Sequence, residues 1–500
     1  MLIKGPIMYE RLSSYSNLIL QELHKAKDRS IDMLDLSVLH LGATRVETLI
    51  QIIQAIPQSS TCVNLSGNDF GRMKGADIAR VFQSLPETVT TIDVSDNDLD
   101  LMSADALVQF MQSIPKSVST LNLGSNSLGR RSVGTVSRIF QAIPGSIKSL
   151  NLRGNDLFHL GDNLPIVLQN LSPNLESLDL SLNYFDKLRP DTIVNSLKAI
   201  PRGVKVLAMG MNFSHMNIEI LSALPTIFSA YPSGVTHLDF SVNQFVRGIQ
   251  YGDGEISGRA LNALTPNVAS LDLSSSELFA CEASNLARTL SQLSGTVIIL
   301  DLGLNQLGKM NDNDLKEILC AIPDTLKVLS LRGNGLGEKS IEQLRLALTA
   351  LHKELVFIDL SENQFKPEVE QELIGMFSSS AKVSLQSRSG GLKEAYESTL
   401  LKAEAAASSQ EEHASSAGLS SESPTDSMGG ANSPSSQRGV DVESPYKFFV
   451  HSSRSLATSG RGDQDRRRHK TFNSTVRQLD DPSGVDTDPT VTPPSRRKSI

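Results

Sequence analysis

The chain has 500 residues, a net charge of −8 and 39% hydrophobic residues, and its composition changes abruptly near Ser389. The acidic balance argues against a general nucleic-acid-binding surface, because such surfaces need clustered positive charge. The three cysteines, Cys62, Cys281 and Cys320, lack CxxC spacing, which argues against a disulfide framework or a zinc site and favours a reducing compartment. No stretch has the length and apolar content of a membrane span or a signal peptide.

The first predicted element is a helix near the N-terminus. Met8, Leu12, Tyr15, Ile19 and Leu23 recur at helical spacing. A repeat begins soon afterwards, and the first unit of a stacked repeat would otherwise expose its core. Residues 1–30 are therefore predicted to form an N-terminal helical cap.

A repeat of about 29 residues occupies residues 31–365. The segment TIDVSDNDL at 91–99 returns as TLNLGSNSL from residue 120 and as SLNLRGNDL from residue 149. Twelve units share one slot that usually holds asparagine: Leu39, Asn68, Asn97, Asn126, Asn155, Asn183, Asn212, Asn243, Ser276, Asn305, Asn334 and Asn363.

Each unit combines a short strand with a helix. Apolar residues five and three places before the asparagine slot alternate with polar ones, which is the pattern of a strand with one buried face. Apolar residues nineteen, fifteen and twelve places before the slot, such as Leu49, Ile53 and Ile56, have helical spacing. A proline such as Pro57 usually follows and ends the helix.

The LxLxxNxL core and the unit length resemble the ribonuclease-inhibitor-like leucine-rich repeats. The resemblance implies an α/β fold: a horseshoe solenoid of about twelve units with parallel strands on the concave side and helices on the convex side. Residues 366–388 are predicted to form a C-terminal cap, with a helix over 367–377 and a last strand over 382–386.

A polar stripe is predicted along the concave face, four places before the asparagine slot. Its members are Asp35, Asn64, Asp93, Asn122, Asn151, Asp179, Ala208, Asp239, Asp272, Asp301, Ser330 and Asp359. The stripe could attract a basic partner surface. Alternatively, these short side chains could be solvated or hydrogen-bond their neighbours.

The seventh unit interrupts the stripe with apolar residues. Val206, Ala208 and Met211 fall on the columns expected to be exposed, beside Leu182 of the sixth unit and Val242 of the eighth. An apolar patch surrounded by polar groups is typical of a protein interface. The alternative is a local insertion that folds over the patch.

An insertion lies next to this patch, because residues 246–258, with four glycines, lengthen the connection after Asn243. A flexible loop here would place Tyr251 on the rim of the binding surface; the alternative is a tolerated surface insertion. We expect the partner to contact the sixth to ninth units, where Asp239 of the stripe also lies. Arg153 and Arg332, at equivalent concave positions, are candidates for flanking polar contacts.

Residues 389–500 contain 22 serines and few large apolar groups, so disorder is expected. Within them, residues 392–407 favour a short helix, either a spacer or a helix for a partner. The basic cluster from Arg466 to Lys470 could serve nuclear import, anionic lipid or RNA contact, or could be a solvated charge run.

The repeats contain no pattern typical of an active site, a metal site or a cofactor site, so a binding protein rather than an enzyme is expected. The IPxxxxxLxLxxNxL sequence pattern and the polar tail resemble those of the leucine-rich-repeat effectors that intravacuolar bacteria secrete through type IV systems. That resemblance implies capture of a partner protein, such as a host protein, in the host cytoplasm.

The alternative resemblance is to the Ran GTPase-activating proteins, which would make the chain a regulator of a GTPase in the cytoplasm of the producing cell. Those proteins carry a strongly acidic region after the repeats. Residues 389–500 depart from that pattern, because they balance 14 basic against 15 acidic groups.

Overall fold

The computed structural model describes residues 12–26, 30–351, 354–377 and 381–385. Thirteen parallel strands form one sheet, in which each strand pairs with the next one along the chain. The strands are β1 (Met33–Asp35), β2 (Cys62–Asn64), β3 (Thr91–Asp93), β4 (Thr120–Asn122), β5 (Ser149–Asn151), β6 (Ser177–Asp179), β7 (Val206–Ala208), β8 (His237–Asp239), β9 (Ser270–Asp272), β10 (Ile299–Asp301), β11 (Val328–Ser330), β12 (Phe357–Asp359) and β13 (Lys382–Ser384).

Helices alternate with these strands along the chain. They are α1 (Leu12–Ala26), α2 (Val46–Gln54), α3 (Gly75–Phe82), α4 (Ala104–Ser113), α5 (Val133–Ala142), α6 (Leu164–Leu168), α7 (Pro190–Ala199), α8 (Ile218–Phe228), α9 (Phe245–Tyr251), α10 (Glu255–Asn262), α11 (Ala283–Leu290), α12 (Asp312–Cys320), α13 (Ile341–Leu348) and α14 (Pro367–Phe377). Most units also have a short 3-10 helix between the strand and the α-helix. No helix in the described ranges is long and apolar enough to cross a membrane.

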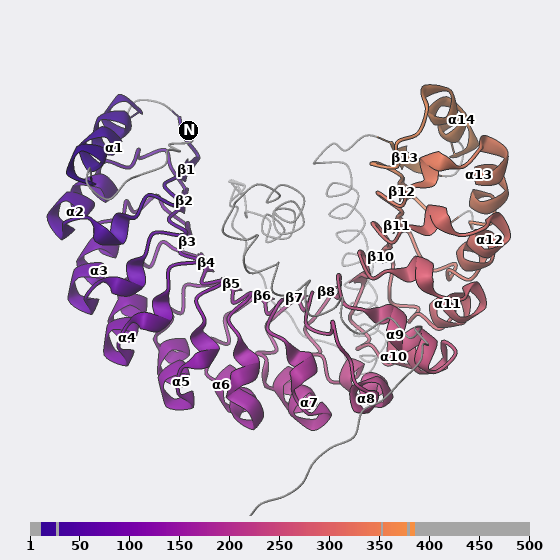
Figure 1. Ribbon diagram of the computed structural model, residues 1–500, viewed down its shortest axis with the longest axis horizontal. Helices are drawn as coiled ribbons and strands as arrows, with labels where there is room; N and C mark the ends of the chain where they lie inside the picture. Colours follow the sequence, from indigo (N-terminus) through magenta and orange to yellow (C-terminus); the bar gives the residue numbers. More distant parts are fainter. Residues whose placement is uncertain (1–11, 27–29, 352–353, 378–380, 386–500) are drawn as a thin grey trace, which may run out of the picture. The chain divides into compact units, whose positions relative to one another are not determined.

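The repeats stack in a curve, with the strands on its inner side and the helices on its outer side (Figure 1). Strands pack about 4.8 Å apart while packed helices need about 8–10 Å, so the helical side must fan outward. The predicted leucine-rich-repeat solenoid, with a concave sheet and convex helices, is confirmed.

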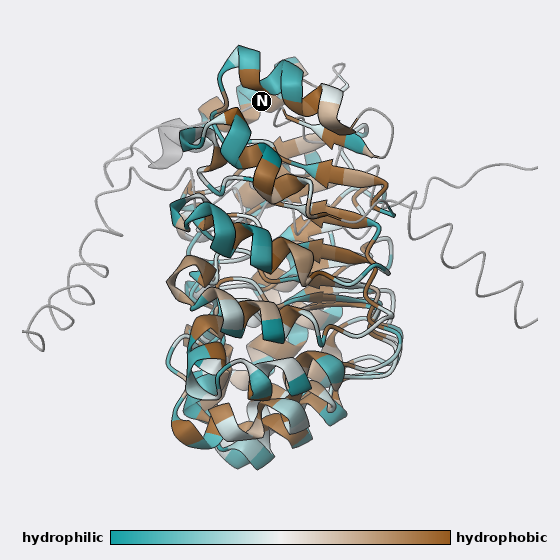
Figure 2. Ribbon diagram, turned by 90° about the vertical axis from the view of Figure 1, so that its right-hand side faces the viewer, coloured by the Kyte–Doolittle hydropathy of each residue, from teal (hydrophilic) through white to brown (hydrophobic). Residues whose placement is uncertain are grey.

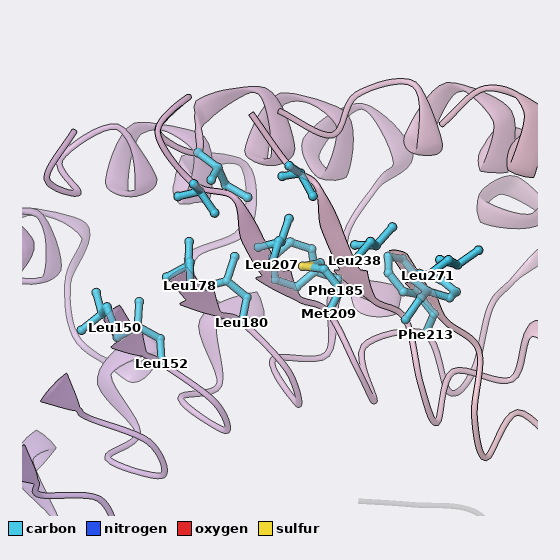
Figure 3. Packing of buried hydrophobic residues seen from close by; sticks show 14 of the residues in the cluster. Leu150, Leu152, Leu178, Leu180, Phe185, Leu207, Met209, Phe213, Leu238 and Leu271 are labelled. Atoms are coloured by element: carbon cyan, nitrogen blue, oxygen red, sulfur yellow. The ribbon is translucent and has the colours of Figure 1, made fainter. Parts of the chain in front are cut away.

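The core lies between the sheet and the helices and consists of repeated rows. Equivalent residues pair in register, as Leu207 does with Leu178 and Leu238. Figure 3 shows these leucines in a row across neighbouring strands, and all three are buried. In Figure 2, brown apolar residues recur in neighbouring strands, whereas the helices mix brown and teal residues.

Both ends of the sheet carry additional elements. Ile19 and Leu23 of α1 are buried against the first repeats. At the other end, Leu373 and Phe377 of α14 are buried, and β13 pairs with β12 as a thirteenth strand. The predicted cap residues 1–11, 27–29, 378–380 and 386–388 lie outside the described residues.

Buried asparagines connect successive units. The Asn155 side-chain oxygen accepts the N–H groups of Asn126 and Leu128, each at 3.2 Å. Its amide nitrogen donates to the carbonyl oxygens of Leu123 and Leu152, each at 3.0 Å. One side chain thus satisfies four backbone groups where the chain leaves the strand, which is why asparagine recurs in this slot.

The ninth unit lacks this asparagine where the preceding unit is irregular. Ser276 fills the slot, and its hydroxyl donates to the carbonyl oxygen of Ser274 at 3.3 Å. In the unit before it, the Phe245 N–H donates to the carbonyl oxygen of Asn243, and the chain enters α9 directly. An asparagine at position 276 would accept from two backbone N–H groups, as Asn155 does, and the one on Phe245 has another acceptor.

The predicted disorder of residues 389–500, the predicted helix at 392–407 and the basic cluster from Arg466 to Lys470 all lie outside the described residues.

Candidate functional site

The polar stripe on the concave face is tied to the backbone. Ten of its members accept a hydrogen bond from the backbone N–H two residues further on, at 2.7 to 3.1 Å. In β9, for example, Asp272 accepts from Ser274 at 2.7 Å. These bonds hold the turn that follows each strand. Of the two interpretations of the stripe, hydrogen bonding to neighbours is the one that the geometry favours.

The ionised carboxylates of the stripe are destabilised by their surroundings. Burial raises the pKa of Asp239, Asp272 and Asp301, against the opposing effect of the hydrogen bonds they accept. The pKa of Asp272 is raised furthest, since Asp301 and Asp239 add repulsion to the effect of burial. Parallel pairing places these carboxylates at equivalent positions of neighbouring strands.

A left-handed backbone position lies beside the stripe. The residue directly before the asparagine slot has a φ between 53° and 65° in all twelve units. Most units place there a glycine or a short or polar side chain, such as Gly67, Asp96 or Ser125. Glycine, aspartate and asparagine adopt this conformation most readily, whereas other side chains pay a steric cost of about 1–2 kcal/mol.

Three consecutive units depart from this preference. Leu182, Met211 and Val242 have φ values of 56° each and are half-buried. We call these three residues the apolar ridge. Their units are joined by the backbone bonds from Leu182 N–H to Gly210 O at 2.9 Å and from Met211 N–H to Ser241 O at 3.2 Å. The ridge is therefore a continuous line of large apolar side chains in a conformation that disfavours them.

Arg153 lies along the concave face next to this ridge. Its Nη2 is 3.2 Å from Met211 Sδ, two units away. The positive charge also lowers the pKa of Asp179 and of Asp239, partly offsetting the effect of burial. Arg153 can extend this far because the equivalent residues of the next two units are the small Ser181 and Gly210.

Arg332 occupies the corresponding place in the eleventh unit but does not approach the ridge. Its Nη2 forms an ion pair with Glu362 Oε2 at 2.8 Å. Asp301 and Asp359 also interact favourably with its charge. The structure therefore places Arg332 in a separate cluster of charges.

The prediction that Val206 and Ala208 are exposed is wrong. They lie on the concave face of β7, but their exposed fractions are 5% and 1%. Alternation along a strand assigns a side chain to one face of the sheet, but it does not reveal how closely that face is covered. Of the five residues of the predicted patch, only the apolar ridge remains partly accessible.

The prediction of a flexible loop at residues 246–258 is also wrong. The segment forms most of α9 and the start of α10, which contact α8 and α11. Its glycines permit close packing: a Cβ at Gly248 would lie 2.8 Å from Ser257 Oγ. The missed signal was the helical spacing of Phe245, Val246 and Ile249, all of which are buried.

Tyr251 consequently belongs to the helical side rather than to the concave rim. It ends α9 with 42% of its surface exposed. Its hydroxyl is 3.4 Å from the hydroxyl of Ser222 in α8. The structure does not bring Tyr251 together with the apolar ridge.

Sequence reasoning missed two further apolar residues in the left-handed column. Val38 is 62% exposed and Leu304 is 41% exposed. Both could have been found from their place directly before the asparagine slot. Ser275 separates Leu304 from the ridge, and Val38 lies in the first unit.

Within the described ranges, no three or more His, Cys, Asp or Glu side chains are grouped so that they could hold a metal ion. The concave face instead provides apolar contact area at the ridge, with one arginine and several carboxylates beside it. That combination is typical of a protein-binding surface.

Comparison with known proteins matches the chain to solved structures. No protein-family model and no curated protein matches the chain. Among solved structures, the chain is similar to the crystal structure of the leucine-rich repeat-containing protein LegL7 from Legionella pneumophila. The identity is 23%, the match covers 72% of this chain and 94% of that chain, and the TM-score is 0.44.

Proposed function

We propose that this protein binds a partner protein through the concave face of its solenoid, with the apolar ridge at the centre of the contact. The observation that carries the proposal is the conformation of Leu182, Met211 and Val242. A left-handed backbone disfavours their side chains by about 1–2 kcal/mol each. Strain of this kind is typical of functional sites, where a particular side chain must be presented.

Polar groups beside the ridge would orient the partner. Arg153 already contacts Met211, and its charge interacts favourably with the carboxylates of Asp179 and Asp239. Arginine next to a desolvated apolar centre is the arrangement found at the energetic centres of protein interfaces. Val206 and Ala208 are buried, so neither would touch the partner.

A double charge substitution tests the location. Met211→Glu combined with Val242→Glu should weaken partner binding at least tenfold, because two carboxylates would be buried in the contact without partners. Ser125→Glu combined with Ser275→Glu is the matched control, since both serines occupy the same left-handed column outside the ridge. The location is wrong if both double variants fold normally and bind the partner equally well.

We further infer that the protein acts as a secreted bacterial effector in a host cell, with residues 389–500 carrying the export signal. The support is the resemblance of the IP-linked repeat and the polar tail to type IV-secreted effectors. A translocation reporter fused to residues 389–500 should reach the host cytoplasm. Failure of the reporter to move, with an established effector tail as positive control, would count against the inference.

If the captured partner is a GTPase, hydrolysis separates capture from regulation. An adaptor leaves the rate of GTP hydrolysis unchanged, whereas a regulator of the Ran GTPase-activating kind raises it. The full chain and the partner, mixed at equal concentration, are sufficient for this assay.

A further inference from the structure

Two aromatic rings and a lysine form a cluster beside the apolar ridge, in the segments that follow β5 and β6. The Lys187 Nζ lies 4.3 Å from the centre of the Phe158 ring and 4.2 Å from the centre of the Tyr184 ring. The two rings meet edge to face, with their centres 5.6 Å apart. We call these three residues the cation clamp. Lys187 is exposed, and both rings are half-buried.

The cation clamp adjoins the ridge through the backbone. Tyr184 is two residues after Leu182, so their Cα atoms are at most about 7 Å apart. Tyr184 also has a left-handed backbone, with a φ of 57°, which disfavours an aromatic side chain. Most other units place a small or polar residue directly after the asparagine slot, such as Asp98, Ser127 or Gln306. The sixth unit therefore carries large side chains at both of its left-handed positions.

The tenth unit contains a counterpart that shows what the cation clamp lacks. Lys309 is four residues after its asparagine slot, as Lys187 is, and its Nζ lies 4.8 Å from the centre of the Phe279 ring in the preceding unit. The Lys309 Nζ also donates to Gln306 Oε1 at 2.5 Å. Gln306 occupies the place of Tyr184, so in the sixth unit a second ring replaces this acceptor.

Lys187 also lacks the acidic partner that a neighbouring unit could supply. Arg130, four residues after its slot in the fourth unit, pairs with Asp156 of the following unit at 2.8 Å. The seventh unit offers no such acid, because the core residue Phe213 directly follows its slot. The charge of Lys187 lowers the pKa of Asp186, but among the described residues no carboxylate forms an ion pair with Lys187.

An ammonium held in this way keeps hydrogen-bonding capacity for another group. It carries three N–H donors, and aromatic faces attract its charge without accepting conventional hydrogen bonds. The two rings restrict the movement of the Lys187 side chain, which reduces the conformational entropy lost when a ligand binds. A carboxylate would supply the acceptor oxygens and the opposite charge.

We propose that the cation clamp receives a carboxylate of the partner protein while the ridge contacts apolar side chains next to that carboxylate. This inference rests on the proposed function and specifies the chemistry of the partner, namely an aspartate or glutamate beside large apolar residues. Tyr184 is a positioning residue, because its ring holds the ammonium in place of an internal acceptor. The clamp adds an electrostatic selection among partners that the ridge alone cannot make.

Peptides provide a probe that requires no knowledge of the natural partner. A phage-displayed library of random peptides of about 12 residues is selected on the full chain. Ridge-dependent peptides are those that lose binding to Met211→Asn combined with Val242→Asn. They should be enriched in aspartate or glutamate next to large apolar residues. Replacing that acid with its amide should weaken binding of a selected peptide about fivefold or more in a fluorescence titration.

Substitutions in the chain locate the contact. Lys187→Met keeps an apolar stem against the rings but removes the charge, so the amide replacement should then cost less than about twofold. Lys309→Met is the matched control at the same place in the tenth unit and should leave the full cost. Tyr184→Gln, which recreates the Gln306 arrangement around an intact Lys187, should reduce the cost. A tyrosine with only a structural role would leave it unchanged.

The outcomes separate this inference from the proposed function. Ridge-dependent peptides without a preference for acids would overturn the role of the clamp alone, as would an acid effect that survives Lys187→Met. Peptides that bind independently of the ridge, or the absence of any enriched peptide, would contradict the proposed function as well.

Discussion

At the scale of single residues, asparagine in the slot stabilises the fold, whereas a large apolar residue directly before the slot destabilises it. Asparagine in the slot satisfies backbone groups that would otherwise be buried without partners, as Asn155 does for four of them. The residue before the slot lies on a left-handed backbone, where Leu182, Met211 and Val242 are held at a steric cost. The stability of the fold explains why asparagine occupies the slot. It does not explain why apolar residues precede the slot in these three units.

The asparagine ladder gives a first prediction. Asn155→Ala removes hydrogen bonds from four buried backbone groups, and each orphaned group costs about 1–3 kcal/mol, partly relieved by relaxation. We expect the free energy of unfolding in urea to fall by about 3 kcal/mol or more. Asn174→Ala is the control, because its side chain bonds the carbonyl oxygen of Gly145 at an exposed site and should cost less than about 1 kcal/mol. Equal losses for the two variants would contradict this account of the ladder.

The raised pKa of Asp272 gives a second prediction. The folded chain retains this proton at pH values at which the unfolded chain has lost it, so ionisation lowers stability as the pH rises through the folded-state pKa. The contribution of Asp272 to the melting temperature should therefore rise as the pH is lowered from 7 towards 3.8, the ordinary pKa of an aspartate carboxyl. Asp272→Asn keeps the acceptor for Ser274 N–H and should raise the melting temperature at pH 7 and reduce this rise.

Asp162 is the matched control, because its pKa is shifted in the opposite direction. Hydrogen bonding from Thr192 and the nearby Arg189 lower its pKa, so its ionised form is favoured by folding. Asp162→Asn should not raise the melting temperature at pH 7. If the two asparagine variants respond alike to pH, burial of the stripe is not the cause.

At the scale of elements, α9 shows why part of the site could not be predicted. Four glycines in residues 246–258 indicated flexibility, but in the structure Gly248 and Gly254 make close contacts with neighbouring helices, and Gly258 lies against the Gln292 side chain just after α11. Glycine has the same sequence signature whether it frees the backbone or lets another chain segment approach. The helical spacing of the apolar residues in this segment indicated the correct structure. The sequence-based prediction gave more weight to the number of glycines.

Gly254 gives a third prediction. It precedes α10 with a φ of 79°, and a Cβ there would collide with the backbone of Asn285. Gly254→Ala should lower the free energy of unfolding by about 2 kcal/mol or more, since backbone strain and overpacking add. In α5, a Cβ at Gly134 would meet nothing within 4 Å, so Gly134→Ala should raise the free energy of unfolding by about 0.5–1 kcal/mol. A tolerated Gly254→Ala would restore the flexible-loop interpretation.

At the scale of the whole molecule, the sequence predicts the solenoid well because each repeat contacts mainly its neighbours and obeys the same column rules. Leu207, Leu238 and Leu271 have the burial that their period-two positions require. The burial of Val206 and Ala208 did not follow from those rules, because they assign a side chain to one face of the sheet and not its degree of exposure. Long-range contacts such as Arg153 to Met211 were likewise invisible to local periodicity.

The apolar ridge lies just after the ends of β6 to β8, on the concave side of the sheet. Stability alone does not explain why a leucine, a methionine and a valine occupy this left-handed position in three consecutive units. Binding of a partner on the concave side, as proposed above, would account for them.

Paired measurement of stability and partner binding for Met211→Asn combined with Val242→Asn tests the central claim most directly. Asparagine tolerates the left-handed backbone, so relief of strain should keep the free energy of unfolding unchanged or raise it by about 1 kcal/mol. Affinity for the partner should fall at least tenfold, because the apolar contact is lost. Ser125→Asn combined with Ser275→Asn, in the same column, should change neither quantity. The claim that the ridge serves binding would be contradicted if the affinity of the ridge variant were unchanged. It would also be contradicted if the affinity fell together with the free energy of unfolding.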